Sequence, residues 1–213
     1  MSAHPVSVLD RITVEGTTIY PGQTAPAAFF LAPLSVRERN AMNGQLADEG
    51  IAPQTDELRL AARAAIPTLW PDQAAELLAL CDEMDAHDDT TVPDDPDGRT
   101  AHEKEGLRLL RLYNARIHNP LTRETCPTYT ALQRRRREFV LRLAFLRVQY
   151  SLRGWERGPC DFATEDRPAD RGFRTGPVIA LADVVDQLSE ADFDLLEQKA
   201  TGLSEVPKPA RGN

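Results

Sequence analysis

The chain has 213 residues, of which 41% are hydrophobic and 27% are charged, a composition that excludes a wholly disordered or collagen-like chain. Its length fits one domain with short appendages. The sequence has no apolar run long enough to span a membrane and no basic start with an apolar run typical of a signal peptide, so we expect a protein of the cytoplasm that is neither secreted nor membrane-bound.

The net charge of −8 comes from 33 acidic and 25 basic residues, and two segments hold opposite charges. Residues 82–98 contain eight acids and no base, while residues 134–157 contain eight arginines and two glutamates. A segment of like charge with Pro and Gly has little apolar surface to bury, so we expect a mobile acidic loop at 87–99. A calcium-binding loop does not fit, because aligning Gly98 with the invariant glycine of such loops puts Pro93 at the first ligand position.

A small β element is expected near the N-terminus, over about 11–33. Residues 11–20 alternate around a Glu-Gly pair and are rich in β-branched side chains, which is typical of a short hairpin. Residues 27–33 offer a third short strand that would join this hairpin. The pattern then changes to the helical period, so the fold class we predict is mainly α with a small N-terminal β-hairpin (α+β).

Capping and stop signals delimit the predicted helices. Ser35 followed by Glu38 predicts a capping box at the start of the first helix, and Gly50 suits its left-handed end. Pro67 is expected to stop the second helix, and Gly154 to end the longest one. The helices are expected at about 35–49, 55–66, 71–87, 101–118, 128–153 and 180–202.

These elements are expected to form a single mainly helical domain over 1–203, followed by a frayed tail at 204–213. Asn119 and Pro120 are expected to end the fourth helix, and the glycines and prolines of 154–177 predict a long loop. Within the last helical segment, Ser189 is a natural helix cap. The fourth helix is expected to be amphipathic, with one apolar face formed by Leu107, Leu110, Tyr113 and Ile117.

A search for catalytic and metal-binding motifs gives little. The sequence contains no nucleophile elbow, phosphate-binding loop, dinucleotide fingerprint or HExxH zinc motif. Three cysteines without CxxC spacing argue against a disulfide framework or zinc ribbon, and Cys81 lies on an apolar helix face that favours a core position. A nucleophilic pairing of Cys126 or Cys160 with a histidine stays open, because such partners meet in space. We therefore expect no enzyme, no metal and no cofactor.

Seven residues are candidates for binding a partner. The arginine run has three interpretations: a solvated face paired partly with carboxylates, an acidic protein partner, or nucleic acid, which the acidic net charge makes the unlikely choice. An aromatic residue after a helix-ending glycine covers the end of a core or, if exposed, fills a pocket of a partner. The candidates are Arg134, Arg135, Arg136, Arg137, Phe139, Phe145 and Trp155.

Three blocks of the chain together resemble the tail assembly chaperones of long-tailed bacteriophages and prophages. The first is the β element followed by a helix that opens on a PLSxRE-like segment, the second a hydrophobic helix ending in RGWE-like residues, and the third the closing helical block 182–203. The acidic segment 87–99 departs from the family. The residues that carry the two short motifs are Pro33, Leu34, Ser35, Arg37, Glu38, Arg153, Gly154, Trp155 and Glu156.

The resemblance implies a function without catalytic residues. Chaperones of this family are thought to bind the long, aggregation-prone tape measure protein and to help recruit tail tube protein while the tail polymerises. The resemblance therefore implies a non-enzymatic protein of the bacterial host cytoplasm whose partners are the tape measure protein and the tail tube protein. The alternative is a structural virion protein, such as a head-tail connector or head-completion protein, whose arginines would face DNA.

Overall fold

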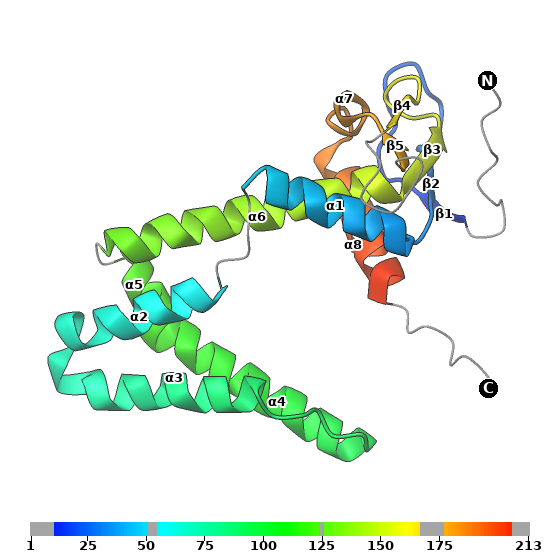
Figure 1. Cartoon of the computed structure of the whole chain (residues 1–213). Helices are drawn as coiled ribbons and strands as arrows, with labels where there is room; N and C mark the ends of the chain where they lie inside the picture. The colour runs from blue at the N-terminus through cyan, green and yellow to red at the C-terminus, as the bar shows by residue number, and fades with distance from the viewer. Residues whose placement is uncertain (1–10, 51–54, 124–125, 167–176, 206–213) are drawn as a thin grey trace. The chain divides into compact units, whose positions relative to one another are not determined.

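A computed structural model describes residues 11–50, 55–123, 126–166 and 177–205. The fold is mainly α with a small β element, as the sequence predicts (Figure 1). The contacts divide the chain into two compact units where the sequence analysis expects one domain. Unit 1 comprises Met1–Ile51 and Phe139–Asn213, and unit 2 comprises Ala52–Glu138. Among the described residues, no helix has the length and apolar character needed to cross a membrane.

Unit 1 contains a three-stranded antiparallel sheet in the order β1-β2-β3. The strands are β1 (Ile12–Glu15), β2 (Ala28–Leu31) and β3 (Leu152–Glu156). The predicted hairpin within 11–20 is wrong, because β1 pairs with β2, the strand expected at 27–33. Residues 17–20 are not a strand, since Thr17 and Tyr20 bind a carboxylate of a distant helix instead.

The predicted end of the longest helix is also wrong. Helix α6 (Pro127–Ser151) stops before Leu152, and the RGWE segment continues as strand β3 rather than as helix. Phe29 of β2 pairs with Trp155 of β3, so this segment completes the sheet. The change from helix to strand cannot be predicted from the apolar pattern, because Leu152 continues the pattern of the helix. Its side chain is buried in the core of unit 1.

The first helix of unit 1 is confirmed. Helix α1 (Val36–Asp48) starts with a full capping box, in which Ser35 Oγ accepts from the Glu38 backbone N–H at 3.2 Å and Glu38 accepts from the Ser35 backbone N–H at 2.8 Å. Gly50 has a φ of 68°, the left-handed conformation that ends such helices.

The pair of helices predicted within 180–202 is confirmed as α7 (Ala182–Val185) and α8 (Glu190–Glu205). The residues before them form strand β5 (Val178–Ala180), which pairs with β4 (Thr164–Asp166). Ser189 caps α8, as expected, by accepting from a backbone N–H at 3.2 Å. Most of the predicted tail, 206–213, and the loop residues 167–176 lie outside the described residues. The core of unit 1 packs the sheet against α6 and α8, through Val14, Phe29, Leu31, Val148, Leu152 and Leu196.

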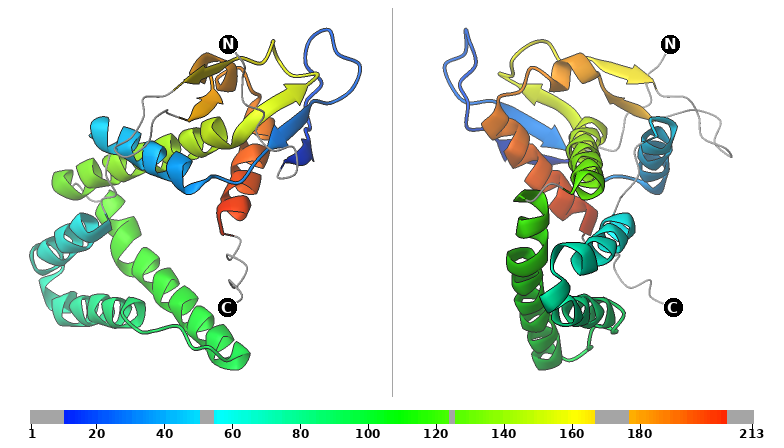
Figure 2. Two further views of the ribbon diagram at one scale, coloured as in Figure 1. Left: turned by 45° about the vertical axis from the view of Figure 1, so that its right-hand side comes forward. Right: turned by 90° about the vertical axis from the view of Figure 1, so that its left-hand side faces the viewer.

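Unit 2 is built from helices that follow one another in the chain (Figure 2). Its core is formed by apolar side chains of α2, α3, α4, η3 and α5 with Tyr129 of α6. The elements before α6 are α2 (Thr55–Leu69), the short 3-10 helix η2 (Pro71–Gln73), α3 (Ala74–Asp88), α4 (Pro96–Tyr113), the π-helical segment η3 (Asn114–His118) and α5 (Asn119–Arg123).

Two prolines do not stop helices as predicted. Pro67 lies inside α2, and the Trp70 backbone N–H still donates to the Ile66 carbonyl at 2.9 Å, so the loss of one N–H near the helix end is tolerated. Pro120 lies in the first turn of α5, where a missing N–H leaves no bond unmade. The wider turn of η3 precedes it and lets the helical path continue past Asn119.

The acidic loop is shorter than the predicted 87–99. Helix α3 continues to Asp88 and α4 begins at Pro96, so the connection comprises only residues 89–95. Asp95 is the N-cap of α4 and accepts from the Gly98 backbone N–H at 2.6 Å. Asp95 therefore has a structural role as a helix cap, and the mobility of the remaining connection stays a prediction.

Candidate functional site

The four arginines Arg134–Arg137 form an exposed basic surface on α6. Because successive residues of a helix point about 100° apart, four consecutive arginines surround the helix with positive charge. Within the described part of the chain, none of the four forms an ion pair. The arginines are therefore solvated, as one interpretation expects, but they are not paired with carboxylates.

A partly buried polar cluster lies beside these arginines, and sequence analysis missed it. His118 Nδ1 lies 2.8 Å from Tyr129 Oη and 3.1 Å from Gln133 Nε2. Burial lowers the pKa of His118, and the charge of Arg136 lowers it further. The neutral ring accepts a hydrogen bond and fixes the first turns of α6 to η3. The spacing of Tyr129 and Gln133, one helical turn apart, was the only sequence signal for this cluster.

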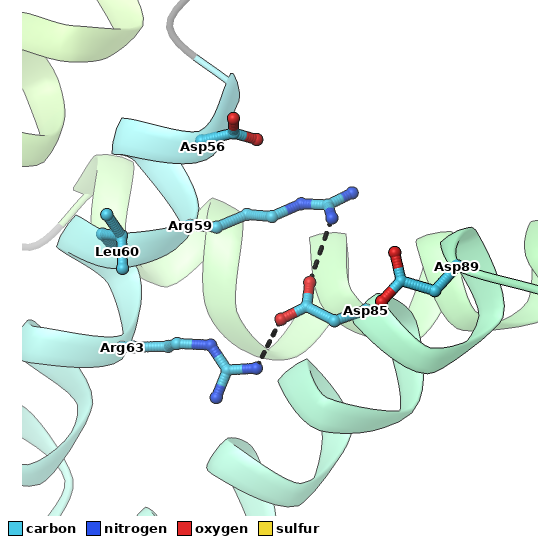
Figure 3. A pocket seen from close by; sticks show the side chains of 6 residues that line it. All are labelled: Asp56, Arg59, Leu60, Arg63, Asp85 and Asp89. Carbon is cyan, nitrogen blue, oxygen red and sulfur yellow. Dashed lines mark hydrogen bonds and ion pairs between the residues drawn. The ribbon is translucent and has the colours of Figure 1, made fainter.

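A second charged region joins α2 to α3 in unit 2. The two oxygens of Asp85 accept from Arg59 at 3.0 Å and from Arg63 at 2.6 Å, and these side chains line a depression of about 340 Å³ (Figure 3). Arg59 also pairs with Asp88, and Arg63 pairs with Asp82 at 2.7 Å.

Both guanidinium groups of this depression thus carry carboxylate partners already. The hydrogen bonds that Arg63 donates to Asp85 and Asp82 raise the pKa of Arg63, and the hydrogen bond that Arg59 donates to Asp88 lowers the pKa of Asp88. An anionic ligand would have to displace these carboxylates. The depression therefore stabilises the α2–α3 pair, and it is a poor candidate for an anion-binding site.

The candidate Trp155 packs against the core of unit 1 and is not a fully exposed side chain. Its ring meets Phe29 edge-on with centroids 6.0 Å apart and meets Phe162 at 5.2 Å. Its Nε1 donates to the Cys160 carbonyl at 2.9 Å. Gly158 lies against the ring, and a Cβ there would come within 2.5 Å of it. The indole is half-buried, so most of its contacts are internal.

The two phenylalanine candidates are also half-buried. Phe145 stacks with Phe193 of α8 at a centroid distance of 6.5 Å, and the Arg142 guanidinium lies 5.3 Å from its ring centroid. Phe139 packs against a separate core cluster of unit 1 that contains Met42. The structure therefore brings Phe145 and Trp155 to the same core and does not gather the three aromatic candidates on an open surface.

Large apolar side chains are exposed on several elements of the described chain, and α4 and α6 each carry some that are close in sequence. On α4, Leu107 is 53% exposed and Leu110 is 46% exposed, and on α6, Val140 and Leu141 are 54% and 61% exposed. The apolar face predicted for the α4 region is right for Ile117, which is buried, and for Tyr113, which packs against the core of unit 2. It is wrong for Leu107 and Leu110, which face solvent, while Leu109 is buried in their place.

The cysteines and histidines give no assembled site in the described chain. Cys81 is buried in the core of unit 2, as predicted, and burial raises the pKa of its thiol. Cys126 and Cys160 are free thiols of intermediate exposure, and burial raises the pKa of Cys160 as well. Among the described residues, no three His, Cys, Asp or Glu side chains are grouped so as to hold a metal ion.

Comparisons with known proteins add no assignment: no protein-family model, no curated protein and no solved structure matches this chain significantly.

Proposed function

We propose that this chain is a tail assembly chaperone-like protein of a long-tailed bacteriophage or prophage, which binds the tape measure protein and assists assembly of the tail tube without catalysis. The resemblance of three sequence blocks motivates this proposal. The observation that carries it is the occurrence of exposed apolar side chains in adjacent pairs, Leu107 with Leu110 and Val140 with Leu141. Apolar side chains three or four positions apart on a helix, as Leu107 and Leu110 are, are the usual anchors by which one helix recognises another.

The energetics of these pairs suit a helical client. Burying one Leu or Val side chain fully contributes about 1.5–3 kcal/mol, so each pair supplies enough apolar surface to hold an amphipathic segment weakly. Weak contacts that repeat along a client suit a protein that must later be released. Trp155 and Phe145, which are packed internally, support the unit from which Val140 and Leu141 project.

Co-expression with the tape measure protein encoded by the same genome tests the proposal. We expect the wild-type chain to keep this client soluble and to co-purify with it. The double variants Leu107→Ser/Leu110→Ser and Val140→Ser/Leu141→Ser should each reduce the co-purified client at least about fivefold, on the scale of lost interface anchors. Circular dichroism should show that both variants keep their helices.

Leu60→Ser is the matched control. Leu60 is 66% exposed and belongs to neither pair; it lines the depression between the charged residues of α2 and α3. Its replacement should leave the amount of co-purified client unchanged. Absence of any complex with the wild-type chain, or an equal loss in Leu60→Ser, would contradict the proposal.

A second function, a structural virion protein that contacts DNA, is favoured by one observation. Arg134–Arg137 are exposed and, in the part of the chain that the structure describes, unpaired, as a phosphate-binding surface requires. If this function holds, the protein should be present in purified particles, and its affinity for duplex DNA should fall with salt with a log-log slope of about 0.9 per neutralised phosphate. Arg134→Gln/Arg137→Gln should flatten that slope. No binding to duplex DNA at physiological salt would exclude it.

A further inference from the structure

Unit 2 exposes acidic side chains that its own arginines do not neutralise. Arg59 and Arg63 pair with Asp82, Asp85 and Asp88, at the end of α3. Beyond these pairs, the acids of the connection and of the first turn of α4 are exposed, and their side chains have no ion-pair partner among the described residues. These free acids are Asp89, Asp94 and Asp97.

The same unit exposes Arg134–Arg137, which are likewise free of ion pairs within the described ranges. The acidic surface lies at the start of a continuous helical stretch that runs from Pro96 through α4, η3 and α5 to Arg123 (Figures 1 and 2). At a rise of 1.5 Å per residue, this stretch is about 40 Å long, and the four arginines follow it in the chain on α6. Among the described residues, no ion pair joins the two surfaces.

Each copy of the chain therefore has an acidic and a basic surface that form no ion pair with one another within the described residues. We propose that the acidic surface of one copy, Asp89 with Asp94 and Asp97, docks on the basic surface Arg134–Arg137 of a second copy. The contact is head-to-tail, so a bound pair of copies still presents one free surface of each sign, and the assembly extends or closes into a ring.

A second copy fits the basic surface better than duplex DNA. The net charge of −8 opposes the approach of a polyanion, and the free aspartates of the same unit would oppose a duplex that follows the surface beyond the arginines. A second copy instead brings three aspartates on a short connection to four arginines. This inference does not depend on the proposed function, because the client would be held by apolar pairs and not by these charges.

Sedimentation velocity over a range of protein concentrations tests the inference, at about 20 mM and about 500 mM NaCl, where screening of surface charges differs strongly. We expect concentration-dependent association at low salt that disappears at high salt. Arg134→Glu/Arg137→Glu and Asp89→Lys/Asp94→Lys should each weaken this association at least about tenfold, as expected for juxtaposed like charges. Asp95, the cap of α4, is left intact, as is Arg136, which lies beside His118.

Mixing the two charge-reversed variants gives the most specific result. The unchanged aspartates of the arginine-reversed variant can still dock on the unchanged arginines of the aspartate-reversed variant, so an equimolar mixture should form a heteromeric complex that neither variant forms alone. Arg111→Glu/Arg123→Glu reverses the same number of exposed charges elsewhere in unit 2 and should associate as the wild type does.

Three results would overturn the inference: a monomer at low salt at every concentration, association that both reversed variants retain, or a mixture of folded variants that forms no complex. Binding of duplex DNA by a wild-type chain that stays monomeric would assign the arginines to nucleic acid and would also overturn it. Charged contacts are screened at about 500 mM NaCl, so co-purification of the tape measure protein at this salt concentration tests the proposed function alone. A chain that does not self-associate but still co-purifies with the client would contradict this inference and leave the proposed function standing.

Discussion

Unit 1 joins segments from both ends of the chain, whereas every element of unit 2 lies between residues 52 and 138. In unit 1, Thr17 bonds to Asp192, 175 residues away, and strand β3 completes a sheet begun by β1 and β2. In unit 2, the charged contacts between Arg59 and Asp85 connect residues that are 26 positions apart. Unit 1 therefore depends on non-local contacts, and unit 2 on contacts between helices close in sequence.

Unit 1 has partly exposed ion pairs, such as Arg142 with Glu49, as unit 2 does, but it also has one fully buried carboxylate. The Asp192 residue is fully buried, and its carboxylate accepts from the Thr17 backbone N–H at 2.6 Å, from Thr17 Oγ1 at 3.0 Å and from Tyr20 Oη at 2.9 Å. The ion pairs of unit 2 between α2 and α3 are partly exposed on both sides. A buried carboxylate with three donors is costly to remove, while a solvated ion pair contributes little.

The largest effect is expected from Asp192→Ala. The substitution leaves the Thr17 N–H and the Thr17 and Tyr20 hydroxyl groups without their acceptor, so the free energy of unfolding should fall by about 3 kcal/mol or more. Urea unfolding followed by circular dichroism measures the loss. Asp194→Ala, an exposed acid on the same helix, should change it by less than about 0.5 kcal/mol. Equal effects at the two positions would break the contrast between buried and exposed charges.

Trp155→Ala should produce the next largest effect. Removing the indole takes away the contacts with Phe29 and Phe162 and leaves a cavity in unit 1, so we expect a loss of about 2–3 kcal/mol in unfolding free energy. Trp155→Phe keeps a ring in place and loses the hydrogen bond to the Cys160 carbonyl, and should cost about 1 kcal/mol. If Trp155→Ala keeps full stability but loses the client, Trp155 belongs to the client surface and not to the core.

A smaller part of the contribution of Asp192 to the free energy of unfolding should depend on pH. Burial alone would raise the pKa of Asp192, but the hydrogen bonds from Thr17 and Tyr20 outweigh it and lower the pKa. A carboxyl with a lowered pKa stabilises the fold above its unfolded value of about 3.9 and loses this contribution as the pH falls through the folded value. The unfolding free energy should therefore fall more steeply below about pH 4 in the wild type than in Asp192→Asn. Parallel pH profiles would contradict this assignment.

Local signals predicted the parts of the fold that depend on neighbouring residues. The capping box of Ser35 and Glu38 lies within one turn, so its residue types alone specify it. The existence of the main helices followed from apolar periodicity in the same way, and so did the core position of Cys81.

The wrong or missing predictions concern contacts between different elements of the fold, which no local sequence pattern encodes. The α4 sequence offers Leu107 and Leu110 on one side and Leu109 on another, and only packing against the rest of unit 2 decides that Leu109 is the buried one. The partners of Asp192 lie more than 170 residues away, so the sequence offered no signal for them. For the candidate site, the exposed arginines were predictable from composition, whereas the exposure of Val140 and Leu141 depends on which residues other elements cover.

The smallest effect is expected from the charged contacts of unit 2. Arg63→Met keeps the apolar stem of the side chain and removes the ion pairs with Asp82 and Asp85, so the unfolding free energy should fall by about 1 kcal/mol or less at low salt. At about 1 M NaCl the difference from the wild type should shrink, because the Debye length is then about 3 Å. Arg111→Met removes an exposed arginine that has no ion-pair partner among the described residues, and should have no measurable effect. A loss in Arg63→Met as large as that in Asp192→Ala, and insensitive to salt, would mean that unit 2 is also held by buried charges and that the two units do not differ in this respect.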